Sequence, residues 1–362
     1  MISRAALSRF DYVLFAGVIV LALIGVAGVY SAGVHGASGG FFQRQLLWVG
    51  LGILTCLITA SIDYRFLVDH APLLYCLSIL ALITVLVLGT EVNGSKSWIG
   101  VGGFNVQPSE IVKIVIILVL ARYLAEINEN YLRRKHFLGL AGITFLPVIL
   151  IIMQGDLGTA AMYLPILFGM MVVAGLKMRF LAATMLLALC LAPIGWLCLE
   201  DYQRQRILVT LDPELDPQGV GYQTRQSQIA IGSGGILGKG FGNGLQGQLG
   251  FVPEIRTDFI FALLAEEKGL VGACVILLLY FLVLTRLVRI AERARDRAGI
   301  LIVTGIASLV FFHIMLNVGM TLGILPTIGI PLPLLSYGGS STLAIFAAFG
   351  LALSIHHRRY VY

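Results

Sequence analysis

Charged residues are the scarcest class of side chain in this sequence of 362 residues. Asp, Glu, Lys and Arg together make up 12% of the chain, whereas soluble domains carry about 25%. Hydrophobic residues make up 58%, and the mean hydropathy is +0.92. This shortage of charge excludes an ordinary soluble domain, and the solid apolar blocks exclude a transmembrane barrel, whose strands alternate in polarity. The sequence therefore predicts an all-α polytopic membrane protein.

Other common signals are also missing. None of the five cysteines has CxxC spacing, and most lie in apolar runs, which favours packing roles over disulfides. No set of His, Cys and carboxylate residues has the spacing of a zinc site. The glycine-rich stretch near 232–247 has no GxxxxGK[ST] sequence of a nucleotide-binding loop. Basic residues flanking the apolar runs explain the net charge of +6, so we expect no nucleic-acid partner. Without a suitable set of His, Cys and carboxylate residues, we also expect no metal site built by the protein.

The apolar runs are long enough to form transmembrane helices. The run from Val13 to Tyr30 is too long for a signal peptide and has no clear cleavage site, so it is expected to remain as a span. The whole chain, 1–362, is predicted to be one integral membrane domain of about ten spans, each of about 20 residues. They are expected near 12–31, 45–62, 71–90, 108–127, 137–154, 157–176, 180–199, 258–286, 299–322 and 341–356.

Lys and Arg predict the orientation, because they are enriched in cytoplasmic loops. With the N-terminus inside, the inner segments carry most of the basic residues, whereas the short outer loops carry only Arg44 and Lys96. Both termini are then cytoplasmic. The longest loop, 200–257 between spans seven and eight, is then extracytoplasmic, and a loop of that length indicates a functional role. Function is therefore expected on the outer face.

The stretch from Gly250 to Leu270 is the strongest candidate for chemistry. Asp258 stands at the threshold of an apolar run, and Glu266 and Glu267 follow within it. A charged residue at the bilayer midplane costs about 2.5–3.5 kcal/mol on insertion scales, so these acids are expected to face a wet cavity or a partner. Glu266 follows Asp258 after about two helical turns and is expected to help position the same helix.

Other ionisable residues each allow two interpretations. Glu110 and Lys113 lie on one face of the fourth predicted span, where their ion pair either orients helices or presents Lys113 to an anionic substrate. Asp156 follows the fifth span and either caps the next helix or lines an outward-facing cavity. Arg204 and Arg206, in the long loop, either contact lipid headgroups or bind phosphate oxygens bidentately.

Five motifs stand out along the chain: GSKSWI (94–99), QPSE (107–110) with Lys113, DLGT (156–159), RTDFIFA (256–262) with Glu266 and Glu267, and LSYGGSS (335–341). Together they resemble the SEDS proteins (shape, elongation, division and sporulation; the FtsW/RodA/SpoVE family) along essentially the whole chain. Stretches 226–235 and 330–333 are more similar to the RodA branch than to the FtsW branch. Lys96 stands where the family usually has arginine, and Gly155 where it usually has proline, which should allow the Asp156 turn more conformations.

The resemblance implies a ten-span fold and a peptidoglycan glycosyltransferase of the bacterial inner membrane that serves cell elongation. It implies lipid II, a disaccharide-peptide on undecaprenyl diphosphate, as the substrate. It also implies a class B penicillin-binding protein transpeptidase and the elongation machinery as partners. The family's catalytic aspartate corresponds to Asp258. The residues assigned to substrate binding are Glu110, Lys113, Asp156, Arg204, Arg206, Thr257, Glu266 and Ser336.

The resulting hypothesis makes Asp258 a general base that removes the proton of a sugar hydroxyl at the outer membrane boundary. Lys113, Arg204 or Arg206 would supply positive charge to the leaving diphosphate, and a divalent cation, magnesium or manganese, could join them. Two other classes of function remain open. A lipid II flippase would explain intramembrane charge and a cavity without bond formation, and a scaffold would only recruit wall enzymes. The division-specific FtsW role is a further alternative.

Overall fold

A computed structural model describes most of the chain. The described residues are 10–33, 40–92, 95–101, 104–127, 134–177, 201–212, 215–216, 219–248, 250–252 and 254–359, with positions 179, 182, 190 and 197. The predicted seventh span, near 180–199, therefore lies almost wholly outside the described residues. Of the predicted long loop, 200–257, the larger part is described.

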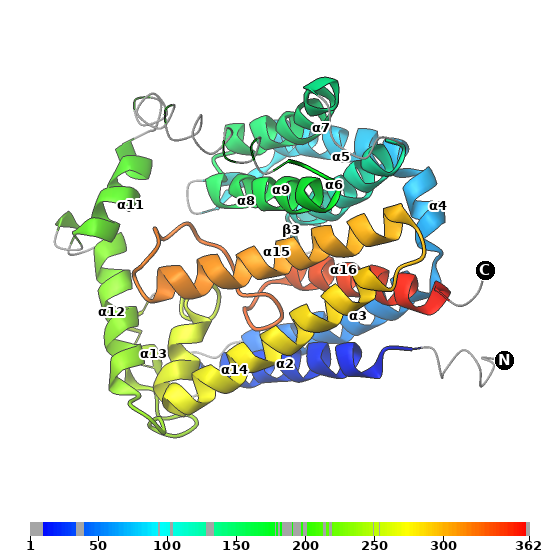
Figure 1. Ribbon diagram of the computed structural model, residues 1–362. Helices are drawn as coiled ribbons and strands as arrows, with labels where there is room; N and C mark the ends of the chain where they lie inside the picture. The colour runs from blue at the N-terminus through cyan, green and yellow to red at the C-terminus, as the bar shows by residue number, and fades with distance from the viewer. Residues whose placement is uncertain are drawn as a thin grey trace.

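Most described elements are helices that run alongside one another (Figure 1). In the centre, α15 packs against α14, α9 and α6, and α16 packs against α3 and α6. α2 covers α14, and α5 covers α6. These helices are α2 (Tyr12–Ser31), α3 (Phe41–Ser61), α4 (Tyr64–Asp69), α5 (Ala71–Leu88), α6 (Pro108–Ala125), α7 (Arg134–Met153), α8 (Leu157–Ala161), α9 (Tyr163–Val173), α14 (Ile260–Glu292), α15 (Arg297–Thr321) and α16 (Gly339–Arg358).

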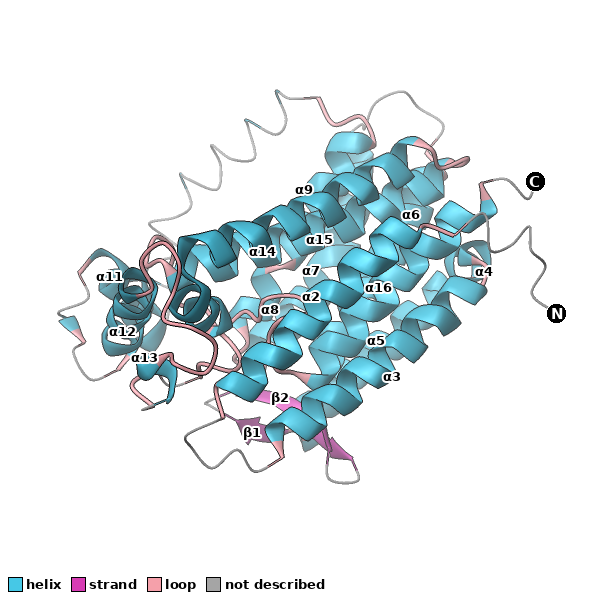
Figure 2. Ribbon diagram, turned by 90° about the horizontal axis from the view of Figure 1, so that it is seen from below, coloured by secondary structure: helices cyan, strands magenta, loops and turns pink. Residues whose placement is uncertain are grey.

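The two ends of the bundle differ. The N-terminal end of α2 and the C-terminal end of α16 lie at one end, here called the terminal end (Figure 1). Three further helices, α11 (Asp201–Leu211), α12 (Val220–Ser233) and α13 (Leu245–Gln248), lie at the opposite end, here called the loop end. Figure 2 shows the same three helices beside one end of α14.

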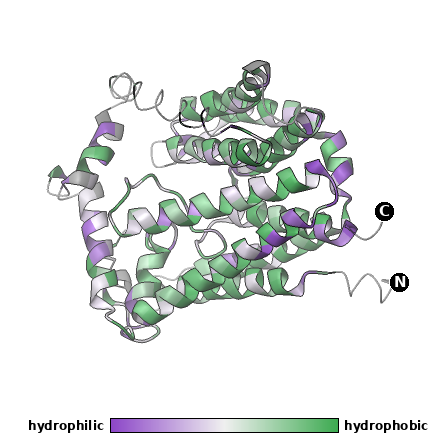
Figure 3. Cartoon of the chain, viewed as in Figure 1, coloured by the Kyte–Doolittle hydropathy of each residue, from purple (hydrophilic) through white to green (hydrophobic). Residues whose placement is uncertain are grey.

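Seven described helices are long and apolar enough to cross a membrane: α2, α3, α5, α7 from His136, α14, α15 and α16. α6 occupies the predicted fourth span and includes Glu110, Lys113 and Arg122. The predicted sixth span is a shorter apolar stretch, Leu157–Val173, made of α8 and α9. The prediction of a helical multi-pass membrane protein is confirmed, while the total of ten spans stays a prediction. Figure 3 shows that hydrophobic residues dominate these helices and that hydrophilic residues gather along α11 and α12.

The predicted outer loop near 91–107 contains a small sheet, which the all-α prediction missed. Strands β1 (Thr90–Val92), β2 (Ser95–Val101) and β3 (Phe104–Val106) form an antiparallel sheet in the order β1-β2-β3. Thr90 lies opposite Trp98, and Ile99 lies opposite Val106. The backbone N–H of Lys96 donates to the carbonyl of Gln154, which attaches the sheet to the end of α7. The sheet therefore lies close to the Asp156 turn.

Much of the predicted long loop is helical and packs on the bundle. α12 lies against α14 and α15. The Ser227 hydroxyl donates to the carbonyl of Thr321 (2.8 Å), and the Gln228 side chain donates to the carbonyl of Leu322 (3.0 Å). Polar side chains of α12 thus donate to carbonyls at the C-terminal end of α15. These carbonyls have no N–H donor within their own helix.

The predicted eighth span, near 258–286, contains a break. Gly269 has φ of 64° and ψ of −166°, a conformation that glycine adopts without steric cost. The backbone of the glycine-rich segment replaces the hydrogen bonds lost at this break. Lys239 and Gly240 donate N–H groups to the carbonyls of Glu266 and Glu267, and the carbonyls of Gly235 and Ile236 accept from Leu270 and Val271. The glycine-rich segment is therefore folded onto α14.

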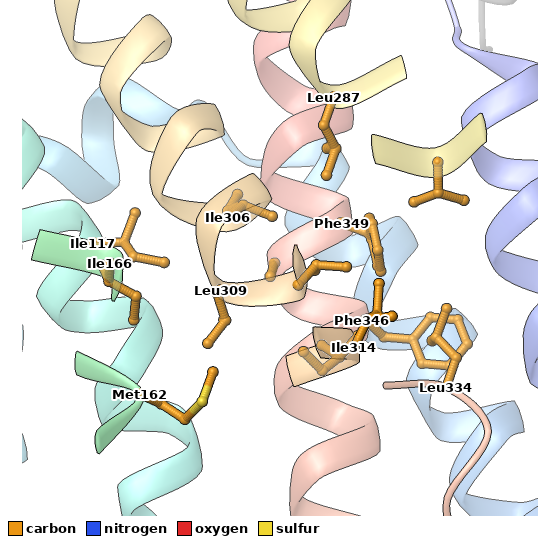
Figure 4. Packing of buried hydrophobic residues seen from close by; sticks show 14 of the residues in the cluster. Ile117, Met162, Ile166, Leu287, Ile306, Leu309, Ile314, Leu334, Phe346 and Phe349 are labelled. Atoms are coloured by element: carbon orange, nitrogen blue, oxygen red, sulfur yellow. The ribbon is translucent and has the colours of Figure 1, made fainter. Parts of the chain in front are cut away.

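Buried apolar side chains join the central helices into one continuous core. Figure 4 shows Ile306 and Leu309 of α15 between Ile117 of α6 and Phe349 of α16. Phe346 of the same helix lies beside Leu334, which belongs to the Pro- and Gly-rich loop between α15 and α16. This contact attaches the loop, residues 322–338, to the core.

Arginines organise the terminal end. Arg286 donates to the buried carboxylate of Asp11 at 2.7 Å, and the same carboxylate caps α2 through the N–H of Leu14. Arg358 pairs with Asp63 at 3.3 Å and donates to the carbonyl of Ser61 at 2.7 Å. Cations at the carbonyl end of a helix are favourable because they satisfy unpaired acceptors and complement the helix dipole.

Candidate active site

Asp258 lies in a tight turn immediately before α14, at the loop end. The carbonyl of Glu254 accepts the N–H groups of Thr257, Asp258 and Phe259 at 3.1, 3.1 and 3.3 Å. Thr257 also donates its hydroxyl to the carboxylate of Glu254 at 3.0 Å. The turn ends the glycine-rich segment and starts a helix whose first residues are buried and apolar, which fixes Asp258 at the edge of that apolar run.

Three consecutive carbonyls hold this turn against the rest of the bundle. The carbonyl of Arg256 accepts the N–H of Tyr337 at 2.8 Å, and that of Thr257 accepts the hydroxyl of Ser336. The carbonyl of Asp258 accepts the side-chain amide of Asn317, on α15, at 2.8 Å. The backbone position of Asp258 is therefore determined by the loop between α15 and α16 and by α15 itself.

Backbone strain is concentrated around the same turn. In the described part of the chain, Glu254 (φ 54°) and Leu334 (φ 69°) are the non-glycine residues with positive φ. Glu254 forms the Asp258 turn, and Leu334 lies in the loop that holds this turn through Ser336 and Tyr337. Left-handed backbone costs a non-glycine residue about 1–2 kcal/mol and is typically retained at functional sites.

The carboxylate of Asp258 is partly exposed and has no hydrogen bond or ion pair with the described residues. A Cβ atom added to Gly329 would lie 3.4 Å from Oδ2 of Asp258. The backbone of Gly329 therefore lies directly beside this carboxylate. Burial, and to a smaller extent the negative charge of Glu254, raise the pKa of Asp258, while the positive charge of Arg206 lowers it; the net pKa is about 7. A carboxyl group with a pKa near neutrality is suited to general acid–base chemistry.

Glu110 and Lys113 form a buried ion pair on α6, with the ammonium 2.8 Å from the carboxylate. The Lys113 Nζ also lies 3.4 Å from Nε2 of His313 on α15. Asn317, which holds the carbonyl of Asp258, follows His313 by one helical turn. The buried pair and the Asp258 turn are thus connected through one face of α15. Lys113 itself is only 2% exposed and makes its contacts within the protein.

Asp156 caps α8, which is the first of the two roles predicted for it. Its Oδ1 accepts the N–H of Thr159 at 3.0 Å, and its Oδ2 accepts the side-chain amide of Gln107 at 2.7 Å. Gly155, before it, has φ of 81°, which proline cannot adopt because its ring fixes φ near −65°. The turn in this chain therefore differs from one that contains proline. The cavity-lining role of Asp156 stays a prediction.

The other predicted substrate-binding residues are divided between regions. Arg206 on α11 acts on Asp258 through its charge, and Arg204 donates to the carbonyl of Leu197 at 2.9 Å. Ser336 is buried and supports the Asp258 turn. Glu266 faces away from this turn: its buried carboxylate pairs with Lys239 at 2.7 Å and accepts the N–H of Gln246 at 3.2 Å. Glu266 therefore anchors the glycine-rich segment.

Three residues that shape the site are not among the predicted site residues. Glu254 and Asn317 shape the turn, and Arg256 projects beside it towards α2 and α3. Arg256 stands two positions before Asp258 in a motif already recognised, which was a usable signal. Nothing in the sequence places Asn317 beside Asp258, because their contact depends on how α15 packs.

Fold and site together define a helical multi-pass membrane protein that has a partly exposed carboxyl group with a pKa of about 7 where α14 begins. The chain belongs to the FtsW/RodA/SpoVE family, because the family profile, described as cell cycle protein, matches residues 6–361. The resemblance inferred from the motifs is thereby confirmed.

Related proteins cover nearly the whole chain. The peptidoglycan glycosyltransferase MrdB of Escherichia coli K12 is 42% identical over 350 residues, which is 94% of this chain and 92% of that protein. A solved structure described as "structural coordination of polymerization and crosslinking by a peptidoglycan synthase complex" contains a chain that is 33% identical, with a TM-score of 0.83 over 97% of this chain and 98% of that chain. Rod shape determining protein RodA of Thermus thermophilus is 31% identical, with a TM-score of 0.74 over the same shares.

Proposed function

We propose that this chain is a peptidoglycan glycosyltransferase that polymerises lipid II into glycan strands and releases undecaprenyl diphosphate. The observation that carries the proposal is the carboxylate of Asp258, which has no partner among the described residues and a pKa of about 7. The names of the relatives support the same activity: MrdB is a peptidoglycan glycosyltransferase, and the synthase complex polymerises and crosslinks.

The reaction joins two lipid-linked sugars at the membrane boundary. Asp258 accepts the proton of the attacking sugar hydroxyl, and the hydroxyl oxygen forms a bond to the anomeric carbon of the second sugar. The bond from that carbon to the diphosphate breaks, and both its electrons leave with undecaprenyl diphosphate. Arg206 contributes positive charge near the developing anion, and Asp258 then returns its proton to solvent.

A divalent cation would be held chiefly by the diphosphate of the substrate. In the described residues, no group of three or more His, Cys, Asp or Glu side chains could hold a metal ion. The partly exposed carboxylate of Asp258 could contribute one oxygen ligand to such a cation, and no step of the reaction above is assigned to a metal.

In the proposed orientation, the loop end lies at the extracytoplasmic face of the membrane and both termini lie in the cytoplasm. The arginines of the terminal end and the rule that basic residues stay inside support this orientation. A class B penicillin-binding protein is the proposed partner within the elongation machinery, because the related synthase complex couples polymerisation to crosslinking. No observation favours a flippase or a scaffold.

Purified protein supplied with lipid II in detergent tests the activity directly. We expect glycan strands that a gel resolves by length, without any other enzyme. Transport of lipid II across vesicle membranes with no polymer would identify a flippase instead.

Lys113→Met separates the two interpretations of the buried ion pair. A role in substrate binding predicts lost turnover, because the site loses a cation that Glu110 holds in place. An unchanged rate with a lower temperature of unfolding would show that the pair only orients helices. Arg122→Met is the matched control, since its partly exposed pair with Glu126 lies near the other end of α6.

A further inference from the structure

A cavity of about 290 Å³ lies between the C-terminal end of α2 and the N-terminal end of α3. Val29 and Tyr30 line it from α2, Gly33 from just beyond that helix, and Phe41 and Gln43 from α3. Arg256 closes it from the side of the Asp258 turn. Neither the mechanism above nor the motif assignments use this cavity.

Arg256 brings an unneutralised charge to the cavity. One terminal nitrogen donates to the carbonyl of Ala32 at 3.1 Å, and the guanidinium lies 4.7 Å from the ring centre of Phe41. Its Nε is buried and has no hydrogen-bond partner, and no carboxylate of a described residue forms an ion pair with it. A buried donor without a partner costs free energy, so an acceptor brought by a ligand would be favourable.

The first turn of α3 adds a second source of positive potential. α3 is 21 residues long, its N-cap is Gly40, and no side chain caps it. The first N–H groups of a helix have no acceptors within it, and the aligned peptide dipoles make this end attractive to anions. A phosphate group is the common ligand where such a helix end and an arginine meet.

The position of the cavity indicates a ligand that reaches it from the membrane. α2 and α3 are both candidate spans, and the cavity lies where they approach the loop end. Tyr30 is 50% exposed at its rim, and Leu46 and Leu47 continue the exposed apolar surface along α3. An isoprenoid chain can lie along this surface while its charged head enters the cavity.

We infer that this cavity is an anion subsite that binds the diphosphate of a lipid-linked substrate, with Arg256 and the first turn of α3 as its donors. Arg256 lies two residues before Asp258 in the turn whose carbonyls Tyr337, Ser336 and Asn317 hold. The subsite is thereby fixed relative to the proposed base. The inference rests on the proposed function only in the identity of the lipid-linked substrate.

Equilibrium binding of farnesyl diphosphate to the purified full-length protein in detergent tests the inference without turnover. Inorganic diphosphate and farnesol are the comparison ligands. Arg256→Gln should weaken farnesyl diphosphate binding by about tenfold or more, because it removes charge-assisted donors. Arg256→Lys should recover part of the affinity. Arg225→Gln, which removes an exposed arginine of α12 remote from the cavity lining, should leave it unchanged.

Gln43→Glu distinguishes a loss of diphosphate binding from a loss of protein stability. A carboxylate in the first turn of α3 favours the helix, so the temperature of unfolding should hold or rise, while repulsion of the diphosphate should raise Kd. Unchanged binding in folded Arg256→Gln and Gln43→Glu proteins would overturn the inference, and equal affinity for inorganic diphosphate would overturn its lipid-linked source. Polymerisation is measured separately on the same preparations: binding that depends on Arg256 without any polymer would sink the proposed function and leave the subsite standing.

Discussion

The terminal end and the Asp258 turn at the loop end differ in how their charges are paired. At the terminal end, Asp11 is buried but meets Arg286, and Arg358 meets both Asp63 and a helix-end carbonyl. At the loop end, the carboxylate of Asp258 and the guanidinium of Arg256 lack oppositely charged partners among the described residues. Paired charges secure the fold, whereas partly buried charges without partners cost stability and are retained where a substrate completes them.

Replacing Asp258 should have the largest effect on polymerisation. Asp258→Asn keeps the size of the side chain but cannot accept the proton, so polymerisation of lipid II should fall by about 10²–10⁴-fold. The folded carboxyl keeps its proton up to a pH of about 7, whereas the ordinary value is 3.8. Ionised Asp258 therefore costs stability as pH rises between these values, and Asp258→Asn should unfold at the same or a higher temperature at pH 8. Near wild-type polymerisation would remove Asp258 from the mechanism.

Breaking the buried pair of the terminal end should act on stability instead. Asp11→Ala leaves Arg286 without its partner and uncaps α2, which should lower the free energy of unfolding by about 2–4 kcal/mol. Thermal unfolding in detergent measures the loss. Arg65→Gln is the control, because its pair with Asp296 is longer, at 3.8 Å, and substantially exposed. Equal losses in the two variants would contradict the contrast between buried and exposed pairs.

The support of the Asp258 turn should be intermediate in effect. Ser336→Ala removes the donor to the Thr257 carbonyl and the acceptor of the Leu332 N–H. Each lost bond is worth about 1 kcal/mol, and the displaced turn should lower polymerisation by about tenfold. Ser233→Ala, which loses only a bond to Ala230 within α12, should match the wild type in both assays. An active Ser336→Ala protein would show that the turn holds itself.

The smallest expected effects are opposite shifts of the pH–rate profile. Glu254→Gln removes a negative charge beside Asp258, so its pKa falls and the midpoint moves to lower pH. Arg206→Gln removes the opposing positive charge, so the midpoint moves to higher pH. Polymerisation rates measured from pH 5 to 9 compare the two variants. Shifts in the same direction would mean that another group titrates.

The sequence was sufficient to predict the apolar helices and Asp258, because both depend on local patterns. Long apolar runs specify helices in lipid whatever their neighbours are. Asp258 was singled out because a carboxylate beside such a run is costly and because the family motif contains it, and its catalytic role stays a prediction. Lys96 was identified by its motif, but its ammonium donates to the carbonyl of Val87 at the end of α5, a contact that spacing does not predict.

Features that depend on distant partners could not be predicted. The break at Gly269 is satisfied by backbone groups from Gly235 to Gly240, about thirty residues earlier in the chain. Glu266 was expected to help position the helix that follows Asp258, because about two helical turns separate the two residues. Its partner is Lys239 instead, because the break and the folded glycine-rich segment bring that lysine to it.

The pH dependence of lipid II polymerisation by the wild-type protein reports the protonation of Asp258, the proposed base, without any substitution. The account predicts a rate that rises about tenfold per pH unit in the acidic range, bends near pH 7 and then levels off. A rate that stays constant from pH 5 to 9, with lipid II saturating and polymerisation itself rate-limiting, would contradict Asp258 as the proton acceptor.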